Sequence, residues 1–302
     1  MSQPQAQLAL RRRSAGLKHS WASALAFLLP GILMTVWLRY YPIAKAFYMS
    51  FYHYDAINPP GRFIGLENYR SLFQTKFYWE AWGNTFSFLA LTLLLVFWMP
   101  LLQALLLDGL RRSRRLVTTI YLITSLIPMS VNVIIWKWIW NPDYGLANQI
   151  FRFFGGSAQL WLSNPALTKF CIVFPGIVGG GVAVLLYMTA IAGIPRDISE
   201  AAALDGCTGF RRIWHIVLPN IRFIIVIQLV LSCIATMQLL DLPYQFTSGG
   251  PSGASTTMGI YIYNAVYKDL SYGKSTAAAV TLFVIIALLT LLQMKLDRQE
   301  RD

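Results

Sequence analysis

The segment Ile194–Asn220 decides the fold, and it reads IPRDISEAAALDGCTGFRRIWHIVLPN. Its first half predicts a short helix, because Pro195 suits the first helical position and Asp197 follows near the first turn, where an acidic side chain is favoured. The run Ala201–Ala203 continues the helix with strong helix formers of almost no side-chain bulk. Gly206 can end this helix in a left-handed conformation that a side chain would disfavour.

A second short helix is expected near Phe210–Val217, and Pro219 then begins the next apolar stretch. Four apolar side chains would lie along one face of this second helix: Phe210, Ile213, Trp214 and Val217. The segment therefore predicts a small helix-turn-helix knob with an alanine surface that another protein can approach closely. Composition alone leaves a second interpretation open, an ordinary connection between two apolar stretches.

The chain around this segment is strongly apolar. Hydrophobic residues make up 56% of the 302 residues and charged residues only 13%, whereas soluble globular chains contain roughly 25% charged residues. An ordinary soluble enzyme and a disordered chain are therefore excluded, and lipid is the expected solvent. Six uncharged apolar stretches approach the ~20 residues that a helix needs to cross a bilayer. They are Trp21–Leu38, Ala81–Leu107, Leu116–Trp136, Phe170–Pro195, Phe223–Leu240 and Ser275–Met294.

A seventh uncharged stretch, residues 242–267, contains TSGGPSGASTT and predicts an extramembrane loop. The expected organisation is a cytoplasmic segment (1–20), a transmembrane domain (21–296) with a cytoplasmic loop at 195–218, and a cytoplasmic tail (297–302). The spans are expected at about 21–43, 81–108, 116–140, 169–193, 219–241 and 275–296.

The Lys and Arg residues predict the orientation. The net charge is +12, and fifteen of the 25 cations fall on one side of the predicted spans, at 11–18, 111–115, 196–222 and 295–301. Cations near short loops mark the cytoplasmic side, so both termini are expected in the cytoplasm and the positive charge does not indicate nucleic-acid binding. The chain is thus expected in a cytoplasmic membrane as a multi-pass protein.

Enzymatic functions find little support in the sequence. The three cysteines, Cys171, Cys207 and Cys233, fit no metal motif, and no Walker, HExxH or GxSxG motif occurs. No catalytic residue, metal or cofactor is therefore expected in this chain. A proton- or ion-coupled secondary transporter would need carboxylates within its spans, and the six stretches contain no Asp or Glu. A subunit that uses the knob only for docking stays a further alternative.

Two outer segments have a distinct pattern. Apolar residues recur at helical spacing between residues 64 and 73, which predicts an amphipathic helix that lies at the membrane interface or packs on a neighbouring span. Trp136, Trp138 and Trp140 belong at a headgroup belt, and Asn141-Pro142-Asp143 then starts a turn.

Polar and aromatic side chains within the spans are candidates for a substrate path. They are Asn132, Trp136, Tyr187, Gln228 and Gln238. The alternative for each is a hydrogen bond between two helices. The run Gly179–Gly181 most simply allows close helix packing.

The knob segment resembles the EAA motif of the permease subunits of ATP-binding-cassette (ABC) importers. The pattern Glu-Ala-Ala, then Asp-Gly after two residues, then Leu-Pro is met by Glu200, Ala201, Ala202, Asp205, Gly206, Leu218 and Pro219. Two positions depart from the family pattern, because Cys207 stands where Ala is usual and Phe223 where a second Pro is common. FIGLENYRSLF (63–73), WKWIWNPDYGLAN (136–148) and residues 242–267 are similar to the carbohydrate branch, of the maltose and glycerol-phosphate type.

This resemblance implies an all-α membrane protein of six spans, with the type I importer permease fold and a cytoplasmic coupling helix. The implied partners are a second permease, two ATPase subunits that bind ATP and Mg, and an external solute-binding protein. The coupling residues would be the seven matched positions together with Ala203. The implied substrate is a sugar or oligosaccharide, with glycerol phosphate or another polar solute as the alternative.

One prediction concerns the outer loop between the last two spans, which contains SGGPSGAS at Ser248–Ser255. Gly249 and Gly250 permit backbone conformations closed to other residues, while Pro251 restrains the loop. We expect this flexible loop to contact the binding protein or to form the outer gate. The alternative is a solvent-exposed connector.

Overall fold

The computed structural model describes residues 21, 23–54, 61–110 and 114–299. The predicted cytoplasmic segment 1–20, the cations at 11–18, 111–112 and 301, and the last residues of the tail lie outside this part. The described residues are mostly helical. Their only strands are β1 (Tyr52–His53) and β2 (Arg62–Phe63), which pair antiparallel.

Four helices in the described part are long and apolar enough to cross a membrane. The first is Ser23–Met49, which includes η1 (Val36–Tyr40) and α2 (Tyr41–Met49). The second is Lys76–Asp108, which includes α4 (Lys76–Leu91), η2 (Thr92–Val96) and α5 (Met99–Asp108). The third is Gly209–Met237, which includes α12 (Gly209–Arg212), η5 (Ile213–Val217) and α13 (Leu218–Met237). The fourth is Tyr272–Leu291 within α16 (Tyr272–Gln299).

A fifth candidate is bent rather than straight. It consists of Pro165–Ile177 and Gly181–Ala192, which meet at 48° and contain α9 (Pro165–Val173), η4 (Phe174–Ile177) and α10 (Gly181–Ala192). The bend falls at Gly180, whose φ of +103° is a left-handed conformation that interrupts the helix. The fourth apolar stretch of the sequence is therefore a broken helix.

The third apolar stretch also forms two helices, α6 (Arg114–Ser125) and α7 (Met129–Ile139). Pro128 precedes α7 and adopts an extended ψ of 141°. Proline has no N–H to donate and disfavours helical geometry in the residue before it, and here the helix is interrupted between Ser125 and Met129. Each piece is shorter than a full span.

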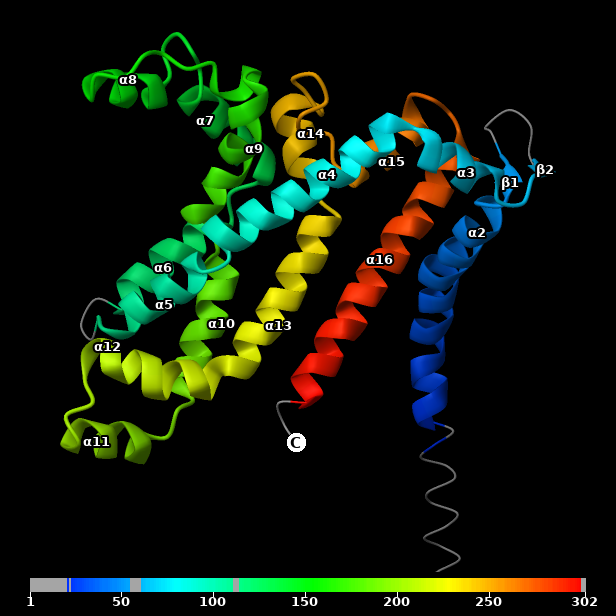
Figure 1. Cartoon of the computed structure of the whole chain (residues 1–302). Coiled ribbons are helices and arrows are strands. Elements are labelled where there is room, and N and C mark those ends of the chain that lie inside the picture. The colour runs from blue at the N-terminus through cyan, green and yellow to red at the C-terminus, as the bar shows by residue number, and fades with distance from the viewer. Residues whose placement is uncertain (1–20, 22, 55–60, 111–113, 300–302) are drawn as a thin grey trace, which may run out of the picture.

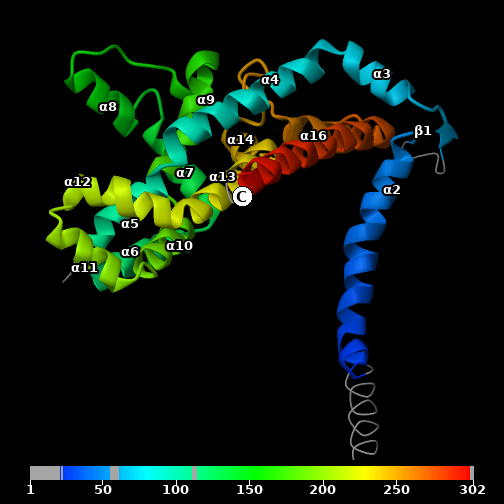
Figure 2. The same ribbon diagram turned by 60° about the horizontal axis from the view of Figure 1, so that its bottom comes forward.

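The helices pack around three apolar clusters. The first joins α5, α10 and α13 and contains Leu107, Tyr187 and Ile221. The second joins α4, α15 (Met258–Tyr267) and α16, and the third joins α4, α7, α9 and α14 (Asp241–Thr247). The first helix stands largely apart from this bundle (Figure 2), and its apolar window has no buried residue. Near its C-terminal end this helix contacts α16, where the rings of Phe47 and Phe283 pack edge to face.

The outer amphipathic helix is present as α3 (Glu67–Gln74). Its Leu72 is fully buried in the cluster of α4 and α16, so α3 packs on neighbouring helices. Asn68 donates hydrogen bonds of 2.9 Å to the backbone oxygens of Ser50 and Tyr52, which fix α3 to the hairpin. Of the two interpretations of this segment, packing on a span is the one that the contacts support.

The two ends of the bundle carry different segments. α8 (Leu146–Phe153), α14 and the β1–β2 hairpin lie at one end, and α11 (Arg196–Leu204) lies at the other (Figure 1). The start of the first helix, in blue, and the end of α16, in red, point to the end that carries α11 (Figure 1).

Candidate functional site

The knob begins with α11. The helix starts at Arg196, one residue later than predicted, because Pro195 is its N-cap. The predicted left-handed end is confirmed, since Gly206 has a φ of +71°. Its N–H donates to Ala203 O at 3.1 Å, and the N–H of Cys207 donates to Ala202 O at 2.8 Å. This is the Schellman arrangement, which satisfies carbonyls at the helix end.

The surface of α11 is only partly alanine. Ala201 and Ala203 are exposed together with Glu200 and Asp205, whereas Ala202 is buried. Leu204 is 90% exposed at the tip of the helix, an apolar side chain that the sequence analysis did not single out. Within this chain α11 therefore offers the surrounding solvent a mixed surface of small, acidic and apolar groups.

The predicted second helix is not separate. α12, η5 and α13 form one continuous helix, Gly209–Met237, which passes through Pro219. In a regular α-helix a proline ring conflicts with the carbonyl four residues earlier. The wide π-turn η5 lies just before Pro219 and makes room for the ring in a continuous helix. The predicted apolar face also divides: Val217 is buried, whereas Phe210 and Trp214 are exposed and stack with ring centroids 6.3 Å apart. Arg211 and His215 complete a shallow cavity of about 350 Å³ beside these rings.

An ion pair connects the knob to the bundle. Arg212 Nη1 lies 3.6 Å from Asp108 Oδ2 at the end of α5. Next to it, Val217 and Ile221 pack against Leu107 in the α5–α10–α13 cluster. The knob is therefore attached to α5 by charge and by apolar packing.

A second cavity, of about 620 Å³, lies between α6, α7 and the break in the bent helix pair. Two of the five candidate path residues line it, Asn132 and Trp136, together with Gly179–Gly181. The other lining residues are Ile120, Ile127, Pro175, Val178, Val182 and Ala183. The tryptophan ring and the amide at one wall can contact a ligand by stacking and by hydrogen bonding.

The remaining three candidates lie elsewhere. Tyr187 is buried in the cluster of α5, α10 and α13. Gln228 is half-buried on α13, and Gln238 is exposed at the C-cap of that helix. Sequence position alone did not separate these residues from Asn132 and Trp136, because all five lie in or beside apolar stretches.

The outer glycine-rich loop is more tightly held than the sequence suggested. Gly249 has a φ of +95°, as expected for a glycine-only conformation, but Gly250 does not adopt a left-handed one. Thr256 Oγ1 donates to Gly249 O at 3.0 Å, and Ser255 Oγ donates to Gly250 O at 2.9 Å. Asn84 on α4 donates to Gly253 O at 2.8 Å and to Thr256 O at 2.9 Å. Pro251 is half-buried, and the loop is bound to α4.

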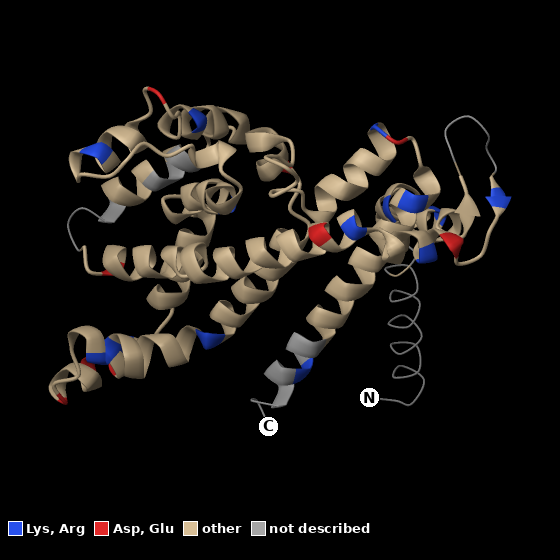
Figure 3. Cartoon of the chain, turned by 45° about the horizontal axis from the view of Figure 1, so that its top comes forward, with Lys and Arg blue, Asp and Glu red and all other residues tan. Residues whose placement is uncertain are grey.

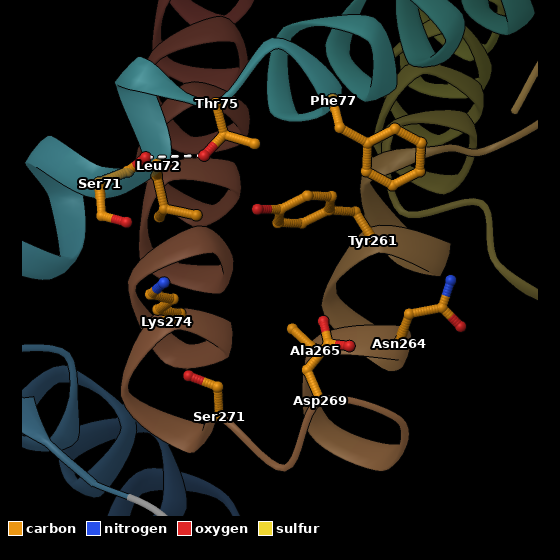
Figure 4. Close-up of a pocket in the computed structure, with 10 residues that line it drawn as sticks. All are labelled: Ser71, Leu72, Thr75, Phe77, Tyr261, Asn264, Ala265, Asp269, Ser271 and Lys274. Atoms are coloured by element: carbon orange, nitrogen blue, oxygen red, sulfur yellow. Dashed lines mark hydrogen bonds between the residues drawn. The ribbon is translucent and has the colours of Figure 1, made fainter.

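A third cavity, of about 410 Å³, lies beside this loop between α3, α15 and α16 (Figure 4). It is lined by Ser71, Leu72, Thr75, Phe77, Tyr261, Asn264, Ala265, Asp269, Ser271 and Lys274. Burial, together with smaller effects of Tyr78 and Asp269, raises the pKa of Tyr261 above its ordinary value. Asn264 Oδ1 is buried without a hydrogen-bond partner among the described residues. The sequence analysis missed this cavity because its walls come from separate segments of the chain.

Residues 109–302 match the family model described as binding-protein-dependent transport system inner membrane component. The chain belongs to this family. The match includes the knob, the cavity at Asn132 and Trp136, and the outer loop. The resemblance found in the sequence is therefore confirmed, and the chain is a permease component of a binding-protein-dependent transport system.

Several curated proteins are similar over most of their length. The sulfoquinovosyl glycerol transport system permease SmoG of Agrobacterium fabrum is 29% identical over 91% of this chain and 90% of its own. The trehalose/maltose transport system permease MalF of Thermococcus litoralis is 30% identical over 86% of this chain and 88% of its own length. The sn-glycerol-3-phosphate transport system permease UgpA of Salmonella typhimurium is 30% identical over 88% of this chain and 90% of its own length.

Solved structures show the same fold. A chain of a bacterial ABC transporter that imports the acidic polysaccharide alginate superposes with a TM-score of 0.79 at 24% identity, over 95% of this chain and 99% of that one. A chain of the bacterial alginate ABC transporter, solved in complex with an alginate pentasaccharide-bound periplasmic protein, superposes with a TM-score of 0.84 at 24% identity. The superposition covers 94% of this chain and 96% of that one. The broken helices and the knob thus occur in a chain with an ABC importer fold.

Proposed function

We propose that this chain forms half of the translocation path of an ATP-driven importer for a sugar or oligosaccharide. The observation that carries the proposal is the knob: α11 projects beyond the apolar helices, ends in a left-handed Gly206, and is attached to the bundle through Arg212. The similar permeases are named for trehalose and maltose, for sulfoquinovosyl glycerol and for sn-glycerol 3-phosphate, which are all polar solutes with hydroxyl groups.

In the proposed topology the chain crosses the membrane six times. The four long helices and the bent pair supply five crossings, and α6 with α7 supplies the sixth. Both termini then lie on the cytoplasmic side with α11, as the cation distribution predicts. A cysteine at exposed Gly109 should react with an impermeant thiol reagent only in opened cells, and one at exposed Ser252 should react in intact cells. Outside labelling of residue 109 would reject this topology.

The proposed partner of α11 is a cytoplasmic ATPase subunit. Its exposed Ala201 and Ala203 fit closely in a cleft, Leu204 supplies an apolar contact, and Glu200 and Asp205 can pair with cations. Leu218 and Pro219 begin α13, directly after the π-turn at the base of the knob. ATP and Mg would bind to the ATPase, and this chain would supply no catalytic residue.

A second permease is the proposed partner of the first helix. Trp21, Phe27 and Trp37 are among its large, strongly exposed side chains, and the apolar window of this helix buries nothing within the chain. Lipid covers such a surface as well as protein does. The copurification experiment below tests whether a second permease accompanies the chain.

The outer end is the proposed contact for a solute-binding protein. Lys and Arg residues gather around the hairpin, α3 and the start of α16 (Figure 3), where they can attract an acidic protein surface. Gly249, Gly250 and Pro251 lie in the adjoining loop, and the polar cavity of Figure 4 opens between the same helices. In this proposal the loop works as a firm contact surface, because its hydrogen bonds to α4 restrain it.

The proposed substrate path passes the cavity that contains Asn132 and Trp136. An indole face binds the apolar face of a sugar ring, and the amide binds its hydroxyls. Gln228 and Gln238 would line the path only if the paired permease encloses their side of α13, whereas Tyr187 is buried within this chain.

The test is to purify the chain with an affinity tag and to identify what accompanies it. We expect a second permease and an ATPase. Proteoliposomes with this complex and its binding protein should accumulate a bound sugar such as maltose or trehalose only when ATP is inside. Uptake that needs an ion gradient and no ATP would support a secondary transporter. Uptake of glycerol phosphate in place of sugar would establish the alternative substrate.

A further inference from the structure

Helix α5 connects the knob with the broken helix that lines the Asn132–Trp136 cavity. Asp108 is the last residue of α5 and forms an ion pair with Arg212. Pro100 is near the start of α5 and packs against Gly180. At 1.5 Å of rise per residue these two positions are ~12 Å apart along the helix axis. A continuous helix of this length moves as one body, because its backbone hydrogen bonds fix each turn to the next.

The knob end of α5 is held by charge and packing. The Arg212–Asp108 side chains are 34% and 23% exposed, compared with 92% and 49% for the other described ion pair, Lys76–Glu80. The Arg212–Asp108 pair is therefore less screened by solvent than the Lys76–Glu80 pair. Leu107 and Val217 are buried next to it in one cluster, and close packing leaves little room for one helix to slide on the other.

The cavity end of α5 is held at the break itself. Gln103 Nε2 donates to Ile177 O at 3.2 Å, two residues before the first glycine of the cavity wall. A Cβ on Gly180 would lie 2.9 Å from the Pro100 ring, which shows how closely α5 approaches this wall. A displacement of α5 would therefore bring the Pro100 ring against the break at Gly180 or move it through the hydrogen bond of Gln103 to Ile177 O.

We infer that α5 transmits displacement of the knob to the cavity wall, and that Asp108, Arg212 and Gln103 are the positioning residues of this connection. The inference rests on the proposed coupling of the knob to an ATPase. The residues act on the path through α5 and touch neither substrate nor nucleotide. Breaking the connection at either end should separate ATP hydrolysis from movement of the cavity wall.

The test follows the cavity wall directly. Val178 lines the cavity and is exposed, so a Val178→Cys variant, with Cys171, Cys207 and Cys233 replaced by alanine, reports access to the wall. The labelling rate of this cysteine is measured in the purified importer complex, without nucleotide and with Mg-ATP plus vanadate. We expect the nucleotide to change the rate. In Arg212→Gln this change should be about fivefold smaller, with ATP hydrolysis retained.

Two control variants, at Arg212 and Lys76, separate positioning from general damage, and a third variant, at Gln103, tests the other end of α5. Arg212→Lys keeps the charge and should retain the nucleotide effect. Lys76→Gln breaks the exposed ion pair of similar type on α4 and should leave it unchanged. Gln103→Leu removes the opposite attachment of α5 with a side chain suited to an apolar helix, and it should reduce the effect as Arg212→Gln does. It also provides the decisive variant should Arg212→Gln fail to assemble.

The outcomes are distinct. A full nucleotide effect in assembled Gln103→Leu or Arg212→Gln overturns the inference and leaves the proposed function intact. A reference complex that hydrolyses ATP without altering the Val178→Cys rate also overturns it. A complex that contains no ATPase at all, in contrast, contradicts the proposed function itself.

Discussion

The knob and the outer glycine-rich loop both depend on left-handed glycines, yet their surroundings differ. A Cβ on Gly206 would meet no atom within 4 Å, whereas a Cβ on Gly249 would lie 2.6 Å from Thr256 Oγ1. The knob exposes Leu204 and Trp214, while the loop buries Ser255 among its own hydrogen bonds. The same local conformation thus occurs in an exposed surface at one end and in a closed structure held by its own hydrogen bonds at the other.

The largest effect is expected for Gly249→Val. The substitution adds a left-handed backbone penalty to a steric conflict with Thr256, so it should destabilise the folded chain by about 3 kcal/mol. Thermal unfolding of the purified chain in detergent measures this loss. An unchanged melting temperature would show that the loop is not held as the contacts indicate.

Asn84→Ala should have the next largest effect. It removes two hydrogen bonds that fix the loop to α4 and leaves the oxygens of Gly253 and Thr256 without this donor, which costs about 2 kcal/mol. Asn220→Ala is the matched control, because the Asn220 amide donates only to Ile216 O on its own exposed helix. Equal melting temperatures of the two variants would contradict the bracing role of Asn84.

Gly206→Val should destabilise the knob by about 1–2 kcal/mol, through the left-handed backbone alone. Because space around this residue is open, the chain should still fold and insert, with a melting temperature above that of Gly249→Val. Uptake in the assembled complex should fall, since the end of α11 is displaced. Full uptake with normal assembly would count against a role of this cap in coupling.

The smallest effect on stability is expected for Leu204→Ser, within about 0.5 kcal/mol, because the side chain is 90% exposed. The same substitution should weaken retention of the ATPase during purification. Exposed Leu106 on α5 offers a control, and Leu106→Ser should not alter ATPase retention. Equal retention in both variants would mean that the tip of α11 does not contact the ATPase.

The sequence by itself determined the membrane class and the first helix of the knob with its cap. An apolar content of 56% leaves lipid as the solvent, and helix caps depend on residues only a few positions apart. The Schellman bonds of Ala202 and Ala203 therefore appear where Gly206 predicted them. The family also followed from the identity and spacing of the residues between Glu200 and Pro219, which are read directly from the sequence.

The tertiary structure decided which polar groups share a cavity and which merely pack. Asn132 and Trp136 meet the glycines of the broken helix, whereas Tyr187 is enclosed by α5 and α13. The Arg212–Asp108 pair joins residues far apart in the sequence. Periodicity and capping report the local face of one helix, but the neighbour of that face is chosen by packing of the whole bundle. Packing of the whole bundle places the outer glycine-rich segment against Asn84 of α4, which holds it by hydrogen bonds. The same packing gives α5 contacts at both of its ends.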